Sequence, residues 1–203
     1  MITKGPPPLD ALLGRDLSPL VEAYFEINQL KQLYRQGWLR RGVPPERCES
    51  VAEHVFGMVM LGWWVVESDF PALDRDKVIR MVLAHELGEV YVGDITPADG
   101  VPAAEKERLE REAVRRVVRD LPHGAETLAL WEEYTAGDTP EARLVKQLDR
   151  LEMAFQAAVY QTQGLGAMDE FIASAGAAVT DERLSAVMAE IKGIAGGGAG
   201  DAA

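Results

Sequence analysis

The sequence predicts an all-α protein, a helical bundle of six or more helices. Three observations favour this class. Apolar residues recur every three to four positions in several segments, as on the buried face of a helix. Helix-start signals precede these segments at Ser18-Pro19, at Ser50 and at Thr139-Pro140. No segment sustains the alternation of apolar and polar residues that a strand shows, and no internal repeat is visible.

The composition is that of one globular domain. The chain has 203 residues, of which 47% are hydrophobic and 27% are charged, which is enough for one substantial core. We expect a flexible N-terminal segment over residues 1–14, a single helical domain over residues 15–192, and a disordered Gly/Ala-rich tail over residues 193–203.

The first half of the domain contains three predicted helices. One begins at Pro19; Gly37 interrupts the chain after it, and residues 38–47 form a basic loop. The capping box at Ser50 starts a second helix that is apolar nearly all round, which predicts a central, buried position, although its tryptophan-rich part, residues 55–66, could bury a partner surface as easily as an internal core. Asp74 caps the third helix.

The second half contains five predicted helices, and loop or turn residues precede each of them. They cover Pro102 to Leu121, Ala125 to Tyr134, Pro140 to Gln161, Asp169 to Ala175, and Asp181 to Lys192.

Charge and cysteine content exclude some classes of protein. The net charge is −12 and no Lys/Arg-rich run occurs, so we expect no long nucleic acid as a ligand. A single nucleotide is compatible with this charge if a metal ion brings it to the protein. One cysteine, Cys48, permits no internal disulfide and suits a reducing compartment. The longest apolar run, residues 55–66, has about twelve residues and is too short for a bilayer. We therefore expect a soluble cytoplasmic protein without a membrane partner.

The stretch from Met81 to Pro97 concentrates side chains that can bind a metal or a proton. An apolar helical run delivers His85, Glu86 and Glu89, and Asp94 follows a turn at Gly93. On a continuous helix His85 and Glu89 would share a face. Buried carboxylates are costly unless a cation or hydrogen bonds compensate them, so this cluster predicts a cation.

Two distant residues extend the cluster. His54 lies in the first turn of its helix, where a single histidine is usually structural. Asp149 lies inside the apolar stripe of the long helix, and the alternative interpretation pairs it with Arg143 or Arg150. Together, two histidines and carboxylates from three helices suit a borderline or hard divalent cation. His123, after Pro122, is interpreted as a surface cap.

Two other motifs are weak or absent. The residues HELGE share their start with the zinc-peptidase pattern HExxH, but Glu89 stands where the second histidine would be. That interpretation would also leave His54 and Asp149 unexplained. No phosphate-binding loop pattern occurs, so hydrolysis of nucleoside triphosphates by a P-loop mechanism is not supported.

Five segments carry a family resemblance: LKQLYRQGWLRRGV, ESVAEHVFGM, HELGEVYVGDITPAD, ALWEEY and VKQLDRLEMAFQAAVYQ. They resemble the HD-domain metal phosphohydrolases, and more closely the HD-domain-containing protein 2 group of 5′-deoxynucleotidases, from about Leu30 to Gln161. The resemblance implies an HD-type helical bundle, often a homodimer. It also implies hydrolysis of deoxyribonucleoside 5′-monophosphates to deoxyribonucleoside and phosphate, with a divalent cation such as cobalt, manganese or zinc, magnesium being a further candidate.

The resemblance also implies roles for individual residues. The implied metal ligands are His54, His85, Glu86 and Asp149; Glu89 and Asp94 match acidic residues that line the site, and Trp38 matches an aromatic residue near the sugar. Beyond the resemblance, we take Glu89 and Asp94 as candidate catalytic residues, and the basic residues Arg35, Arg41 and Arg47 as candidates for binding the phosphate of the substrate. The chain departs from the family pattern at two positions. Glu86 replaces the signature aspartate and is one methylene longer, and Gly37 precedes Trp38 where bacterial relatives have an arginine.

The hypothesis that follows is metal-assisted hydrolysis of a phosphomonoester. The cation would polarise a phosphate oxygen and lower the pKa of a bound water, and Glu89 would orient that water or handle its proton. Asp94 would bind a second cation or a sugar hydroxyl, and an arginine fork would hold the phosphate. Two alternatives stay open. The protein could be an HD-type phosphodiesterase or pyrophosphohydrolase, or a non-catalytic nucleotide-binding protein because Glu86 replaces aspartate.

Overall fold

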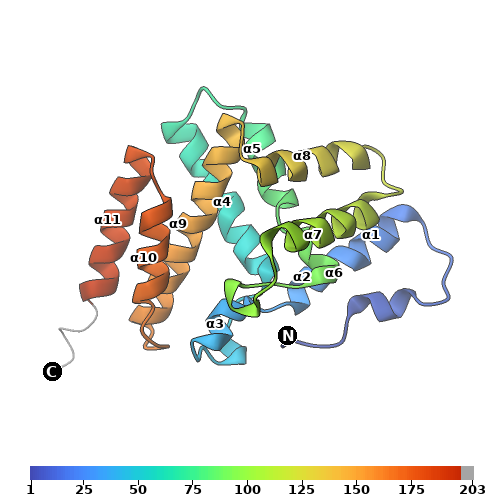
Figure 1. Ribbon diagram of the computed structural model, residues 1–203, viewed down its shortest axis with the longest axis horizontal. Helices are drawn as coiled ribbons and strands as arrows, with labels where there is room; N and C mark the ends of the chain where they lie inside the picture. Colours follow the sequence, from blue (N-terminus) through green and yellow to red (C-terminus); the bar gives the residue numbers. More distant parts are fainter. Residues whose placement is uncertain (198–203) are drawn as a thin grey trace.

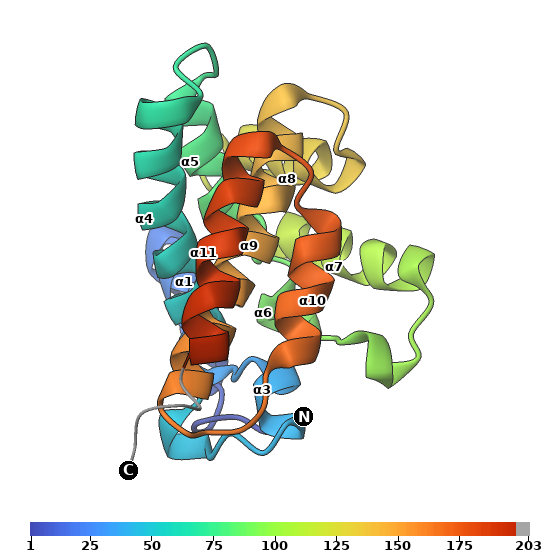
Figure 2. The same ribbon diagram turned by 90° about the vertical axis from the view of Figure 1, so that its left-hand side faces the viewer.

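A long central helix, α9 (Pro140–Thr162), organises the structure, a computed structural model that describes residues 1–197. The helices α4 (Val51–Asp69), α5 (Arg75–Ala84), α8 (Gly124–Ala136), α10 (Asp169–Ala178) and α11 (Glu182–Gly197) all pack against α9. Figure 1 shows α10 and α11 on one side of α9 and α8 on the other, and Figure 2 shows the α10–α11 pair from its own side. The remaining helices are α1 (Pro19–Ile27), α2 (Gln29–Gln32), α3 (Gln36–Arg40), α6 (Glu89–Val92) and α7 (Ala103–Val118).

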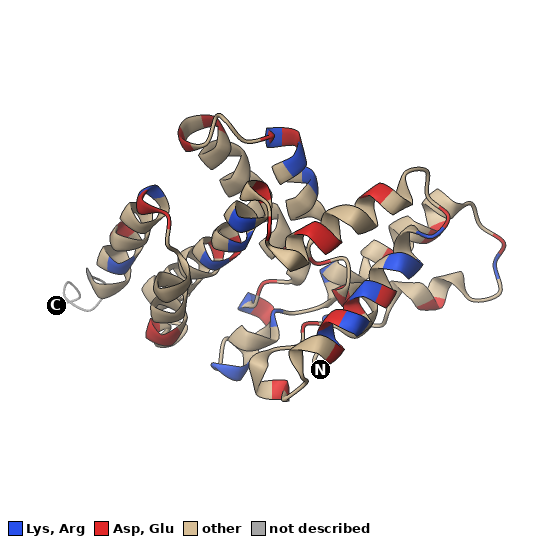
Figure 3. Cartoon of the chain, turned by 45° about the horizontal axis from the view of Figure 1, so that its top comes forward, with Lys and Arg blue, Asp and Glu red and all other residues tan. Residues whose placement is uncertain are grey.

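The predicted all-α class is confirmed. Apart from two isolated bridges, Thr3 with Leu33 and Tyr34 with Ser50, the described chain contains no β structure. Basic and acidic residues are interspersed along the helices and do not separate into a basic and an acidic half (Figure 3). Within residues 1–197 no helix is both long and apolar enough to cross a bilayer.

Local signals start the helices where the sequence predicts. In the capping box of α4 the Glu53 N–H donates to Ser50 Oγ at 3.3 Å, and the Ser50 N–H donates to the Glu53 carboxylate at 2.6 Å. Asp74 accepts from the Lys77 N–H at 3.0 Å at the start of α5. Thr139 accepts from the Ala142 N–H at 3.2 Å at the start of α9. Each bond satisfies an N–H that has no partner inside its own helix.

The core follows the apolar stripe of α9. Its residues Leu144, Val145, Leu148 and Leu151 are buried against the surrounding helices. Their spacing of three and four positions places them along one side of the helix, which is the pattern that the sequence predicts.

Helix α4 is only partly buried, so the prediction that it is buried all round is wrong. His54, Met58, Val65 and Val66 face the core. Phe56 is 69% exposed, Trp64 60% and Trp63 46%. Apolar residues on all sides of a helix indicate that other protein segments cover it, but they do not reveal whether those segments belong to the same chain or to a partner.

The predicted basic loop over residues 38–47 contains regular structure. Gly37 lies within the short helix α3 and does not end a helix, and a 3₁₀ turn follows at Pro45–Arg47. The buried indole of Trp38 packs 4.3 Å from the Phe171 ring of α10, so tertiary packing supports this short helix.

Both ends of the chain differ from the prediction. The N-terminal segment is tied to the domain: Lys4 N–H donates to the Gln32 carbonyl at 2.8 Å, and Lys4 Nζ lies 2.9 Å from the Glu53 carboxylate. A 3₁₀ turn at Pro8–Leu12 follows. At the other end α11 continues to Gly197, past the predicted start of the tail at residue 193, and residues 198–203 lie outside the described part of the chain.

Candidate metal centre and active site

Two histidines and an aspartate from different parts of the chain meet beside α9. His54 lies in the first turn of α4, His85 directly follows α5, and Asp149 lies midway along α9. One donor atom from each lies within 4.8 Å of the other two. His54 Nε2 is 3.3 Å from Asp149 Oδ1, and both histidines are buried.

Glu86 reaches the same place in spite of its extra methylene. Its Oε1 lies 3.5 Å from His85 Nε2 and 3.8 Å from His54 Nε2. The same oxygen accepts a hydrogen bond from Arg35 Nη1 at 3.1 Å. Glu86 is therefore shared between the histidine pair and the guanidinium of Arg35, whose side chain is 17% exposed.

The chain leaves the α-helix at His85, so the predicted continuous helix face of His85 and Glu89 is wrong. After Ala84 the backbone bonds span three residues: the Glu89 N–H donates to the Glu86 carbonyl at 3.0 Å, and Leu87 donates to Ala84 in the same way. Three residues per turn bring positions i and i+3 into line, not i and i+4. Glu89 begins the separate helix α6, where its side chain is buried.

Asp94 follows a turn that Gly93 makes possible with a φ of 79°. Asp94 Oδ2 accepts a hydrogen bond from the Gln36 N–H at 2.6 Å, and its Oδ1 lies 3.8 Å from Arg35 Nη1. Arg35 therefore lies between the carboxylates of Glu86 and Asp94. Although burial lowers the pKa of Arg35, the surrounding carboxylates raise it further, so the guanidinium keeps its charge.

The two histidines differ in their pKa. Burial and Arg35 lower the pKa of His54, but the Asp149 and Glu152 carboxylates on either side of the ring outweigh them and raise it to about 10. Burial lowers the pKa of His85. The pKa of Asp149 is lowered, because His54 outweighs the effect of burial. Burial, Glu86 and Asp94 raise the pKa of Glu89 well above its ordinary value.

The donor atoms of this cluster fit a divalent cation. Within the described chain His54 Nε2, His85 Nε2 and Glu89 Oε2 are buried and have no hydrogen-bond partner. His85 Nδ1–H donates to the Val82 carbonyl at 2.6 Å, which leaves the Nε2 lone pair directed toward Glu86 and Asp149. Two imidazole nitrogens and two carboxylates are a donor set that Zn²⁺, Co²⁺ and Mn²⁺ accept.

The substrate-binding candidates lie at different distances from this centre. Arg35 contacts its carboxylates directly. Arg41 is paired with Glu170 on α10, and Arg47 donates to Gln163 Oε1 at 2.7 Å near the end of α9. Trp38 is buried, and its Nε1–H donates to Glu49 Oε1 at 2.7 Å.

Sequence reasoning missed three residues around the histidines. Glu152 Oε2 lies 2.5 Å from His54 Nδ1. Glu49, His54 and Glu152 form a second group whose possible metal-ligand atoms lie within 4.8 Å of one another. The centre of the Tyr134 ring lies 5.3 Å from that of the His85 ring. Burial and Glu152 raise the pKa of Glu49 to about 7. The sequence contained an indication of Glu152, because Glu152 follows Asp149 by three positions and so shares its helix face. His123, interpreted as a cap, is the exposed N-cap residue of α8 and contacts Glu126 at 2.8 Å.

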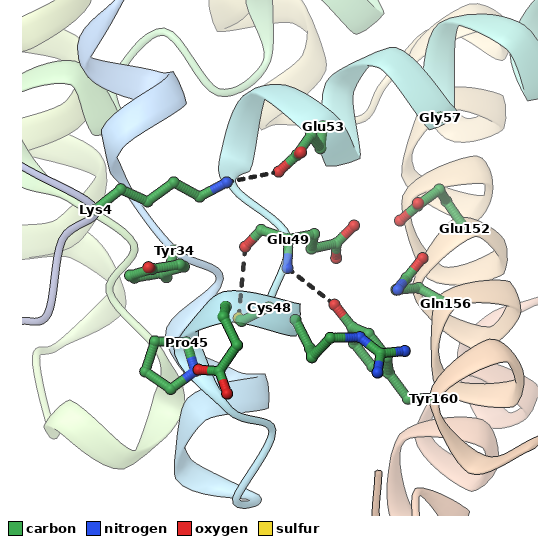
Figure 4. Close-up of a pocket in the computed structure, with 12 residues that line it drawn as sticks. Lys4, Tyr34, Pro45, Cys48, Glu49, Glu53, Gly57, Glu152, Gln156 and Tyr160 are labelled. Atoms are coloured by element: carbon green, nitrogen blue, oxygen red, sulfur yellow. Dashed lines mark hydrogen bonds and ion pairs between the residues drawn. The ribbon is translucent and has the colours of Figure 1, made fainter. Parts of the chain in front are cut away.

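A cavity of about 520 Å³ lies next to Glu152, the residue whose carboxylate contacts His54 Nδ1. Glu49 and Glu152 form part of its wall, with Lys4 and Tyr160 at other sides (Figure 4), and Arg47 also lines it. The Glu49 N–H donates to the Tyr160 hydroxyl at 2.9 Å, which fixes the segment that leads into α4.

A family model for the HD domain matches residues 27–192 of the chain. The chain belongs to the HD domain family. The human 5′-deoxynucleotidase HDDC2 is 39% identical to this HD protein over 150 residues, which cover 73% of this chain and 71% of the human protein.

Solved structures agree with this family. A conserved hypothetical protein from Pyrococcus furiosus superposes on this HD protein with a TM-score of 0.73 and 28% identity, covering 85% of this chain and 98% of the archaeal one. A protein described as a predicted metal-dependent phosphohydrolase from Magnetospirillum magnetotacticum gives a TM-score of 0.66 and 27% identity, covering 87% and 93% of the two chains. The resemblance inferred from the sequence motifs is therefore confirmed.

Proposed function

We propose that this HD protein hydrolyses deoxyribonucleoside 5′-monophosphates to deoxyribonucleoside and phosphate with the help of a divalent cation. The observation that carries the proposal is the meeting of His54, His85 and Asp149, with unpartnered Nε2 atoms on both histidines. The similarity to 5′-deoxynucleotidases supports the choice of substrate class.

The ligands of the proposed cation are His54, His85, Glu86 and Asp149. When bound, such an ion polarises a phosphate oxygen and makes a water more acidic. Because two of the four donors are nitrogen, we propose cobalt, manganese or zinc, with magnesium as the weakest candidate since it prefers an oxygen shell. Because the flanking carboxylates raise the pKa of His54, we expect cation binding to release a proton from its Nε2, where the ring needs a free lone pair to act as a ligand.

Glu89 and Asp94 are the proposed catalytic residues. Glu89 is buried beside Glu86 and Asp94 and has one oxygen without a partner, so it is able to orient a water or take its proton. Asp94 is held by the Gln36 N–H and by Arg35, which leaves its carboxylate fixed for a sugar hydroxyl or a second cation.

Arg35 is the proposed anchor for the phosphate. Its partly exposed guanidinium lies at the edge of the metal cluster and offers several donors in a planar fork, which matches a phosphate better than a lysine does. Arg41 and Arg47, which contact Glu170 and Gln163 in the free protein, are the more distant candidates. Trp38 is proposed to shape the sugar side of the site through its hydrogen bond to Glu49.

The test is release of inorganic phosphate from dAMP, dGMP, dCMP, dTMP and dUMP, each with added cobalt or manganese and with metal content measured. We expect turnover of at least one of these and weaker turnover of the ribonucleotides. Metal-loaded protein that releases no phosphate from any monophosphate would overturn the proposal. Tight nucleotide binding without turnover would instead support a non-catalytic role, and turnover of cyclic nucleotides or guanosine tetraphosphate would support the phosphodiesterase alternative.

We also propose that the protein forms a homodimer through the outer face of α4. Phe56, Met60, Trp63 and Trp64 are spaced as one face of the helix, and the exposed tryptophans and phenylalanine form an apolar surface of the kind that interfaces bury. A cytoplasmic location is proposed because the single cysteine, Cys48, permits no internal disulfide, which suits a reducing compartment. Cell fractionation with an antibody checks the location; recovery in an extracellular fraction would contradict it.

A further inference from the structure

The ring of His54 lies between two carboxylates of the same helix. Asp149 Oδ1 is 3.3 Å from its Nε2, and Glu152 Oε2 is 2.5 Å from its Nδ1. Asp149 and Glu152 are three positions apart on α9, so both reach His54 from one helix face. The two ring nitrogens therefore have different partners: Nε2 faces the proposed cation cluster, and Nδ1 faces Glu152.

This difference matters for the chemistry of the ring. A neutral imidazole binds a cation through a nitrogen lone pair, and the other nitrogen then carries the proton. A carboxylate that accepts a hydrogen bond from Nδ1–H fixes both that tautomer and the ring orientation. His85 has the Val82 carbonyl in the same role, at 2.6 Å from its Nδ1.

A glycine on α4 makes room for the Glu152 carboxylate. A Cβ atom added to Gly57 would lie 2.8 Å from Glu152 Oε1 and 3.4 Å from its Cγ. Gly57 lies one turn after His54, inside a long helix in which glycine is unfavourable compared with alanine. The close approach of Glu152 gives a physical reason for glycine at this position. Figure 4 shows Gly57 on α4 and Glu152 projecting from α9 toward Glu49.

We propose that Glu152 is a positioning residue, which holds the His54 ring so that Nε2 is directed at the metal ligands, and that Gly57 provides the space for it. This inference rests on the proposed metal site. Glu152 does not touch substrate or cation in this arrangement; it acts through His54.

The test compares the cobalt affinity of three proteins, measured by titration of the visible cobalt spectrum. Glu152→Gln keeps an oxygen that accepts from Nδ1–H, so we expect a loss of only a few-fold. Glu152→Met keeps the length but removes the acceptor, and we expect cobalt to bind about 10- to 100-fold more weakly. The matched control is Glu53→Gln, which changes another carboxylate at the same cavity that contacts Ser50 and Lys4, and it should bind cobalt like the wild type. Equal cobalt affinity of Glu152→Met and wild type would overturn the proposal.

Gly57→Ala tests the space without changing the carboxylate. We expect weaker cobalt binding, and we expect Gly57→Ala to add no further loss in a protein that already carries Glu152→Met, because both act through one contact. Independent, additive losses would contradict the role given to Gly57. Circular dichroism and thermal unfolding verify that each variant is folded.

A spectroscopic measurement separates positioning from a merely structural role. In the zinc-loaded protein, long-range ¹H–¹⁵N correlation spectra should show His54 protonated at Nδ1, and Glu152→Met should broaden or shift these signals while the signals of His123 stay unchanged. An unchanged His54 pattern in the folded variant would overturn the proposal. If the wild type binds cobalt but releases no phosphate from nucleotides, the proposed function fails and the positioning role stands. If the wild type binds no metal, both fail.

Discussion

Arg35 Nη1 donates a hydrogen bond to Glu86 Oε1 at 3.1 Å, and this pair lies at the edge of the His54–His85 cluster. The glutamate that replaces the family's aspartate is therefore bound to the proposed phosphate anchor. Glu86 is one of the two departures from the family pattern that the sequence resemblance implies, and the other, Gly37, follows Arg35 by two positions in the chain.

Replacement of Arg35 by lysine should weaken substrate binding. A lysine keeps the charge but loses the planar fork to the phosphate and to Glu86, so we expect KM for the best deoxynucleotide to rise about tenfold or more. Steady-state phosphate release measures this effect. The matched control is Arg108→Lys, since Arg108 is exposed on α7 and paired with Glu105, and its KM should stay within about twofold. Similar changes in both variants would count against the role of Arg35.

Removal of the Asp149 charge should reduce metal binding. Asp149→Asn replaces a carboxylate by a neutral amide in the proposed ligand set, and we expect at least a tenfold loss of cobalt affinity with a parallel loss of activity. Elemental analysis after dialysis gives the metal content. Asp76→Asn, at an exposed position of α5, serves as the control. Full metal content in Asp149→Asn would exclude Asp149 from the ligand set.

The metal-free protein should lose stability as the pH rises above neutrality. The pKa of His54 rises from 6.5 to about 10 in the folded state, so folding favours the protonated ring. This stabilisation is complete below about pH 6.5 and is lost as the pH rises through about 10. Urea unfolding in chelator, at several values between pH 6.5 and 10, should show a decline on the order of a few kcal/mol. The decline should be smaller in His54→Gln; parallel curves for the two proteins would show that His54 is not its source.

Truncation of the central helix should destabilise the fold. Leu148 is fully buried on α9, and Leu148→Ala should lower the free energy of unfolding by about 2–5 kcal/mol because it leaves a cavity. Leu83→Ala removes the same atoms from a side chain that is 53% exposed, and it should cost far less. Denaturant unfolding of both variants makes the comparison, and equal losses would contradict the assignment of Leu148 to the core.

A charge on the outer face of α4 should separate the proposed dimer. Trp64 is 60% exposed, so Trp64→Glu should leave the fold intact while it places a charge in the apolar interface. Light scattering coupled to size-exclusion chromatography should give the mass of a dimer for the wild type and a monomer for the variant. A monomeric wild type at high concentration would refute the dimer.

The sequence by itself determined the helices and much of the candidate site. The start signals at Ser50, Asp74 and Thr139 act within one turn, so they can be read without knowledge of the fold. The stripe through Leu144, Leu148 and Leu151 placed α9 in the core, and a polar Asp149 beside that stripe required a partner.

Only the tertiary structure decided what lies across from each of these residues. It ended the helix at Ala84, placed Glu89 at the start of the separate helix α6, left the tryptophans of α4 exposed, and placed Glu152 against His54 Nδ1. The physical reason is one of range. Hydrogen bonds at helix ends and helical periodicity depend on residues a few positions apart, whereas these four features depend on contacts between segments that only packing brings together.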